Sequence, residues 1–220
     1  MRFVMVPGGW QGGWVFDEVA TELRRDGHDV DAVTLAGLEA AGPADPDRAP
    51  NLDDHIAQVA EIVERTEAPI ALCGHSYAGL VIAGVADRLG DRLAHLVFID
   101  AYVPADGDSC WSLTSQAFRE TFIAGSRADG RWVAVPDGLD PRARPHSLAS
   151  FVQSIKLRGT PEPSYQRTYV SGGAWPGTPF LELVARLSED PGWQVHEIPV
   201  GHNIARRDPL GLAALLTTLA

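Results

Sequence analysis

Short apolar runs and amphipathic stretches alternate along the first part of the chain. Residues 3–6 form an apolar run that predicts a buried strand, and residues 15–25 have the spacing of an amphipathic helix, with a glycine-rich turn between the two. Residues 24–27 place an aspartate and a glycine after two arginines, which is typical of a helix end. A second strand over residues 30–35 completes a strand–helix–strand unit, and the prolines of residues 36–51 predict a loop.

The same alternation continues in the middle of the chain. Residues 52–64 predict a helix, because two aspartates in the first turn complement the helix dipole. The continuous apolar runs at residues 70–73 and 96–99 are typical of strands that are buried on both faces of a parallel sheet, and residues 80–89 predict a helix between them.

Residues 104–163 interrupt this alternation with scattered prolines and glycines, a hairpin near residues 132–135 and one helical pattern over residues 147–157. After this segment the chain returns to short strands and helices, at residues 165–170, 180–187, 193–198 and 209–219. The pattern predicts an α/β fold with an open, mostly parallel, doubly wound sheet. We expect a single domain over residues 1–220, with residues 104–163 inserted as a small cap.

The composition favours a compact protein without a nucleic-acid or membrane role. Of the 220 residues 45% are hydrophobic, and 29 acidic against 18 basic residues give a net charge of −11, which repels nucleic-acid phosphates and anionic lipids. Cys73 and Cys110 are too few for a disulfide framework, and the N-terminus shows no export signal. We therefore expect a cytoplasmic protein with a small-molecule substrate, and the oligomeric state stays open.

One hexapeptide carries a specific chemical signal. Residues 74–79 read Gly-His-Ser-Tyr-Ala-Gly and lie between a predicted buried strand and a predicted helix. In that context a Gly-x-Ser-x-Gly sequence forms a sharp turn that lifts the hydroxyl of Ser76 above the carboxyl edge of the sheet. The alternative interpretation is an ordinary glycine turn in which the serine caps the helix.

A nucleophilic serine needs a base, and His202 is the best candidate. It follows the last predicted strand, in the loop before the final helix, where it could reach the carboxyl edge of the sheet. The other histidines of the chain lie in helical or turn stretches, flank the serine, or lack a position at the end of a strand.

An oxyanion hole would need backbone N–H donors. Gly9, in the turn after the first strand, could supply one N–H beside Trp10, and Tyr77 could supply the other. The alternative for this turn is a dinucleotide-binding loop, but Gly9 and Gly12 do not complete the Gly-x-Gly-x-x-Gly spacing, and no acid ends the second strand.

Three segments together resemble a known family. The stretch 7–14 (Pro-Gly-Gly-Trp-Gln-Gly-Gly-Trp), the serine turn and Gly201-His202 are similar to the plant methylesterase and hydroxynitrile lyase branch of the α/β-hydrolase superfamily and to its bacterial esterase relatives. The resemblance covers about residues 1–103 and 165–220. It implies an α/β-hydrolase fold, a Ser-His-acid triad, and no cofactor or metal.

The chain departs from this family at two places that bear on the mechanism. The family usually has a histidine where this chain has Pro7, and an aspartate just after the strand at residues 165–170, whereas residues 171–180 contain no acid. Asp100 is therefore the first candidate for the triad acid, since it ends a strand that would lie beside the serine strand. The remaining candidates are the acids of the predicted helix at residues 180–187 and the segment after it: Glu182, Glu189 and Asp190.

These residues predict a serine hydrolase that cleaves a carboxylic ester of a small, largely apolar substrate through an acyl-enzyme. Tyr102, Trp111 and Trp132, with the phenylalanines of the cap, are expected to line the substrate pocket. A lyase is disfavoured, because the lyases of this branch use a lysine near the histidine, where this chain has Arg206 and Arg207. Two alternatives stay open: a thioesterase or cyclase on a natural-product intermediate, and a non-catalytic ligand-binding protein on the same fold.

Overall fold

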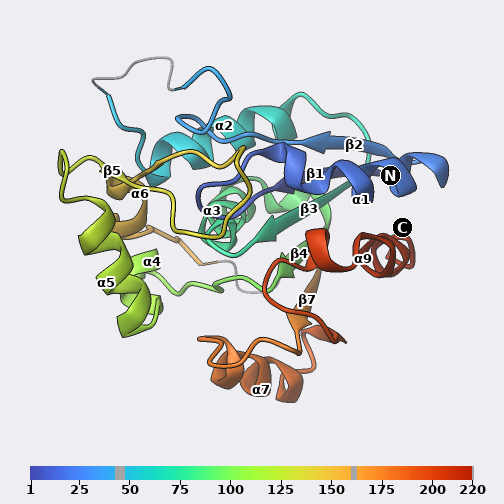
Figure 1. Cartoon of the computed structure of the whole chain (residues 1–220). Coiled ribbons are helices and arrows are strands. Elements are labelled where there is room, and N and C mark those ends of the chain that lie inside the picture. The colour runs from blue at the N-terminus through green and yellow to red at the C-terminus, as the bar shows by residue number, and fades with distance from the viewer. Residues whose placement is uncertain (43–47, 160–162, 220) are drawn as a thin grey trace.

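A computed structural model describes residues 1–42, 48–159 and 163–219, and its centre is one parallel sheet (Figure 1). The strands run in the spatial order β2-β1-β3-β4-β7-β8, and every neighbouring pair is parallel. Their bounds are β1 Arg2–Val6, β2 Asp29–Ala32, β3 Ile70–His75, β4 Leu93–Ile99, β7 Gln166–Gly172 and β8 Gln194–Ile198. The chain order reverses next to β1, so the sheet is doubly wound as predicted.

Helices cover both faces of this sheet. The helices are η1 Gly13–Phe16, α1 Asp17–Arg25, α2 Leu52–Glu64, α3 Ala78–Leu89, η2 Gly90–Arg92, α4 Cys110–Leu113, α5 Gln116–Gly125, α6 Leu148–Val152, α7 Leu181–Glu189, α8 Ile204–Arg207 and α9 Pro209–Thr217. Figure 1 shows α1 and α9 together on one side of the sheet, and α2 and α3 on the other.

The alternation of side chains along each strand explains the two layers. In β1, Val4 and Val6 pack with α2 and α3, whereas Phe3 and Met5 pack with α1 and α9. Successive side chains of a strand point to opposite faces, so a strand between two helical layers must be apolar at every position. The fully buried apolar runs of β1, β3 and β4 follow from this requirement.

Residues 104–163 hold α4, α5, α6 and a two-stranded antiparallel ribbon of β5 (Trp132–Val133) and β6 (His146–Ser147). Figure 1 shows these elements grouped on the side of the molecule opposite both termini. The ribbon corrects the expected local hairpin at residues 132–135, since β5 pairs with a strand that lies well beyond it in the chain. The expected helix over residues 147–157 ends at Val152, and α5 was not expected.

The structure leaves two short internal stretches outside its described residues. Residues 43–47 belong to the loop that the prolines predict, and residues 160–162 belong to the expected cap segment. In the described part of the chain, no helix combines the length and the apolar character that crossing a membrane requires.

Candidate active site

Ser76 occupies a tight turn between the end of β3 and the start of α3. Its φ of 54° lies in the left-handed region, and its backbone is held because Ser76 N–H donates to the Ile99 carbonyl at 3.3 Å while Tyr102 N–H donates to the Ser76 carbonyl at 3.2 Å. A Cβ at Gly79 would collide with the Tyr102 carbonyl oxygen, so the turn needs glycine at that position. The strand, turn and helix predicted around the hexapeptide are all present.

His202 connects Ser76 to Asp100. Its Nε2 lies 3.0 Å from Ser76 Oγ, and its Nδ1 lies 2.7 Å from Asp100 Oδ2. A carboxylate accepts hydrogen bonds, so the proton belongs on Nδ1 and the free Nε2 lone pair faces the serine hydroxyl. This is the tautomer in which a histidine can accept the serine proton.

Asp100 is buried and held in place by the neighbouring strand. Its side chain is 2% exposed, its backbone N–H donates to the Val170 carbonyl at 2.7 Å, and its Oδ1 accepts the Gly172 N–H at 3.0 Å. Its φ of 43° is also left-handed. The other candidate acids are Glu182, Glu189 and Asp190. Among the described residues, none of these three makes a hydrogen bond or ion pair with His202.

Two backbone donors are free beside the serine hydroxyl. Gly9, Ser76, Tyr77 and His202 line one pocket, and the N–H groups of Gly9 and Tyr77 have no acceptor among the described residues. Unbonded N–H groups that converge on one pocket can stabilise a negative oxygen. Trp10, next to Gly9, adopts a left-handed φ of 64°.

Trp175 was missed by the sequence analysis and lies against His202. The indole and imidazole centroids are 4.2 Å apart with a 30° angle between the ring planes. Trp175 belongs to the acid-free stretch after β7. The sequence feature that could have indicated a role for it at the site is an aromatic residue in the loop where the family usually has its acid. Stacking on one face of the imidazole restricts the rotation of His202.

His75, which also lines the cleft, holds the backbone of the same histidine. Its Nε2–H donates to the His202 carbonyl at 3.0 Å, and the two imidazole centroids lie 4.6 Å apart. Burial, and to a lesser extent the nearby His202, lower the pKa of His75 to about 3. His75 is therefore neutral at physiological pH and acts as a hydrogen-bond donor to the backbone of the His202 loop.

Two connected spaces meet at Ser76. An open cleft has a volume of about 470 Å³, and its rim carries Asp137 and Arg207. An inner pocket has a volume of only about 20 Å³, little more than one water molecule needs. The inner pocket is lined mainly by aromatic and apolar side chains: Trp10, Tyr102, Cys110, Phe118, Phe122, Phe151, Trp175 and Phe180.

Trp132 and Trp111, which the sequence predicts in the substrate pocket, are both absent from the lining of these two spaces. Trp132 lines a separate hollow with Gly37 and Arg144, because its position in β5 directs the indole toward Gly37. Trp111 packs against Phe122 from outside, with ring centroids 6.5 Å apart. The aromatic content of the segment was a sound signal, but it did not indicate which rings face Ser76.

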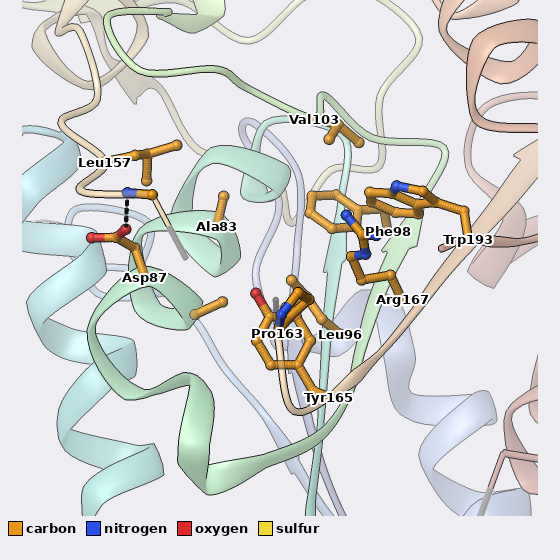
Figure 2. Close-up of a pocket in the computed structure, with 12 residues that line it drawn as sticks. Ala83, Asp87, Leu96, Phe98, Val103, Leu157, Pro163, Tyr165, Arg167 and Trp193 are labelled. Atoms are coloured by element: carbon orange, nitrogen blue, oxygen red, sulfur yellow. Dashed lines mark hydrogen bonds between the residues drawn. The ribbon is translucent and has the colours of Figure 1, made fainter. Parts of the chain in front are cut away.

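A further hollow lies away from Ser76, on the face of the sheet that α3 covers (Figure 2). It has a volume of about 190 Å³, and Leu96, Phe98, Arg167 and Trp193 lie along it. Neither a serine nor a histidine is among its lining residues. The hollow therefore does not contain the pairing of a serine with a histidine that the cleft at Ser76 contains.

No group of three or more histidine, cysteine, aspartate or glutamate side chains arranged to hold a metal ion occurs among the described residues. The two cysteines are buried and free. Burial raises the pKa of both thiols, so neither is a thiolate near neutral pH.

Three buried imidazoles should make the fold sensitive to mild acid. Burial lowers the pKa of His55 to about 4, that of His75 to about 3, and that of His146 well below its ordinary value. Below pH 6.5 the unfolded chain binds these protons and the folded chain does not, so acid favours unfolding. We expect the free energy of unfolding to fall between pH 6.5 and 5.5 by about 1 kcal/mol for each of the three histidines.

Urea unfolding at pH 7.5, 6.5 and 5.5 tests this expectation. Carboxylates titrate mostly below that window, so they contribute little to the change. A stability that stays constant from pH 7.5 to 5.5 would show that the three imidazoles are not held neutral.

Residues 3–215 match a family model described as "Alpha/beta hydrolase family". A carbendazim hydrolyzing esterase from Nocardioides sp. (strain SG-4G) is 33% identical over 99% of this chain and 99% of its own length. The rice esterase PIR7B (Oryza sativa subsp. japonica) is 30% identical over 61% of this chain and 51% of its own length.

A solved structure of an extracellular alpha/beta-hydrolase from a Paenibacillus species has the same fold. Its TM-score with this chain is 0.84, at 21% sequence identity, and the match covers 100% of this chain and 99% of that one. The predicted α/β architecture is thereby confirmed.

Proposed function

The chain belongs to the alpha/beta hydrolase family and is an ester-hydrolysing enzyme, and we propose that it cleaves carboxylic esters of small, largely apolar substrates with Ser76 as the nucleophile. The observation that carries this proposal is the pair of hydrogen bonds of His202, 3.0 Å to Ser76 Oγ and 2.7 Å to Asp100 Oδ2. Both lie within the distance that proton transfer and positioning require.

In the first half of the proposed reaction, Ser76 Oγ attacks the carbonyl carbon of the ester and His202 Nε2 takes the hydroxyl proton. The carbonyl oxygen becomes negative as its π bond breaks, and the N–H groups of Gly9 and Tyr77 donate to it. When the carbonyl re-forms, the bond to the alcohol oxygen breaks, and His202 gives its proton to that oxygen. An acyl-enzyme and a free alcohol result.

In the second half, water replaces the alcohol. His202 Nε2 takes a proton from the water as its oxygen attacks the acyl carbon, and the same two N–H groups stabilise the oxyanion again. His202 then returns the proton to Ser76 Oγ as the acid product leaves. In both halves Asp100 holds the Nδ1 proton and stabilises the imidazolium that forms.

We propose that the expected cap, residues 104–163, shapes the substrate pocket. Its helix α5 supplies Phe118 and Phe122 to the inner pocket, and Asp137 lies at the rim of the cleft. The small, apolar inner pocket favours an acyl group of one or two carbons, whereas the larger and more open cleft accommodates a bulkier alcohol.

A series of p-nitrophenyl esters tests this preference. We expect kcat/KM to be highest for the acetate and to fall by at least tenfold for the octanoate, because the longer chain does not fit in the inner pocket. Replacing Phe118 with alanine should raise the octanoate-to-acetate ratio of kcat/KM about tenfold by opening that pocket.

The matched control for this variant is Ile123→Ala, on the same helix. Ile123 is 49% exposed and lines neither space beside Ser76, so its replacement should leave the ratio unchanged. Equal rates for acetate and octanoate with the unmodified enzyme would contradict the proposed acyl preference.

A further inference from the structure

Trp10, which follows the proposed oxyanion donor Gly9, has every polar group bonded to the segment 133–146. Its backbone N–H donates to His146 Nδ1 at 3.1 Å, its carbonyl accepts the Arg144 N–H at 2.9 Å, and its indole N–H donates to the Val133 carbonyl at 3.1 Å. A tryptophan with a left-handed φ of 64° has a strained backbone that its surroundings must offset. Those surroundings come from the expected cap and not from the sheet.

The proton arrangement of His146 is fixed by its contacts. Nδ1 accepts the Trp10 N–H, so the ring proton is on Nε2, which lies 2.9 Å from Ser150 Oγ. The Ser150 hydroxyl in turn donates to the Ser147 carbonyl at 2.9 Å. His146 has no solvent exposure, and burial keeps it neutral by lowering its pKa. Nδ1 is therefore a permanent acceptor for the backbone of Trp10.

His146 also contacts the other parts of the oxyanion site. Its ring stacks on Phe151 with centroids 4.3 Å apart and a 10° angle, and a Cβ at Gly9 would lie 3.1 Å from the Phe151 ring. The Tyr77 ring meets His146 edge-on at 4.9 Å. The His146 imidazole thus bonds to Trp10, the residue after the first donor, and lies beside Tyr77, which carries the second donor. It also stacks on Phe151, the ring that lies next to Gly9.

We propose that His146 is a positioning residue for the oxyanion hole, an inference that rests on the proposed function. Gly8 and Gly9 have no side chains to restrict their backbones, so the direction of the Gly9 N–H depends on how the next peptide is held. By accepting the Trp10 N–H, His146 keeps the Gly9–Trp10 peptide in the orientation that leaves the Gly9 N–H free for the substrate oxygen. The expected cap then has two roles: it shapes the pocket, and through His146 it holds the backbone of the oxyanion hole.

Two substitutions at His146 separate this role from packing. In His146→Leu the acceptor is lost, whereas in His146→Asn the side-chain oxygen stands the same number of bonds from the backbone as Nδ1 and can still accept. We expect kcat to fall about 30-fold in the leucine variant with KM within about threefold, since a displaced oxyanion donor weakens the transition state more than the substrate complex. The asparagine variant should recover kcat to within about fivefold of the unmodified enzyme.

Inhibitors add a readout that a packing defect would not move. A trifluoromethyl ketone forms a hemiketal oxyanion with the serine, and the corresponding methyl ketone binds largely without one. In the leucine variant the trifluoromethyl ketone should lose about 30-fold in affinity while the methyl ketone loses less than threefold. Equal losses for both ketones, or an unchanged kcat, would overturn the proposal.

His95→Leu is the matched control, because it also removes a buried imidazole. His95 lies in β4 and lines neither the cleft nor the inner pocket beside Ser76. This variant should leave kcat and the affinities of both ketones unchanged. If His146→Leu does not fold, Ser150→Ala is the substitute, because it removes the partner of His146 Nε2. We expect this variant to lose about threefold in affinity for the trifluoromethyl ketone and none for the methyl ketone. Equal affinity losses for the two ketones in Ser150→Ala would overturn the proposal. If the trifluoromethyl ketone fails to inhibit even the unmodified enzyme, the proposed function fails instead.

Discussion

Replacing Ser76 with alanine should reduce ester hydrolysis by a factor on the order of 10⁴ to 10⁶, because the nucleophile of the proposed acyl-enzyme is removed. The fold should persist, since among the described residues the hydroxyl bonds only to His202, and the left-handed turn is held by backbone bonds to Ile99 and Tyr102. Hydrolysis of p-nitrophenyl acetate and thermal unfolding measure the two effects separately.

A matched control is Ser188→Ala. The Ser188 hydroxyl lies on α7 and donates to the Val184 carbonyl at 2.8 Å, away from the cleft, so its removal should leave turnover unchanged. A fluorophosphonate probe should label the unmodified enzyme and the Ser188 variant but not the Ser76 variant. Turnover that survives Ser76→Ala would refute the serine mechanism, and ligand binding without any labelling or turnover of the unmodified protein would favour the binding-protein alternative.

The strands that position the site were predictable because burial on both faces leaves a simple signal. Apolar runs at residues 3–6, 70–73 and 96–99 all lie within β1, β3 and β4. Residues at the carboxyl ends of neighbouring parallel strands share one edge of the sheet, so Ser76 and Asp100 could be expected to lie close together without a structure.

The fold of residues 104–163 was less predictable, because the packing of this segment depends on contacts distant in sequence. Phe122 is the one buried residue of helix α5, so the apolar period of this helix is weak in the sequence. Likewise, β5 pairs with β6 across an irregular segment, and nothing local shows that His146 would lie against Trp10, 136 positions earlier. The position of Trp175 on His202 has the same cause.

Asp100→Asn should lower kcat by roughly 10⁴-fold, and the contacts of Asp100 give the reason. Asparagine tolerates the left-handed φ of 43°, so the backbone should keep its course. The Gly172 N–H, now bonded to Oδ1 at 3.0 Å, needs an acceptor, so the amide oxygen should stay with it. The amide NH₂ then faces His202 Nδ1.

That donor would require the His202 proton to move to Nε2, and an Nε2 that carries a proton cannot accept the one on Ser76 Oγ. Glu182→Gln, which neutralises another of the candidate acids, is the control and should change kcat less than threefold, because Glu182 makes no hydrogen bond or ion pair with His202 among the described residues. Steady-state kinetics of both variants with p-nitrophenyl acetate show which of the two carboxylates, Asp100 or Glu182, acts as the acid. A normal kcat for Asp100→Asn together with a large loss for Glu182→Gln would assign the acid to Glu182 on α7. Two normal values would exclude both residues and leave Glu189 and Asp190 as the remaining candidates.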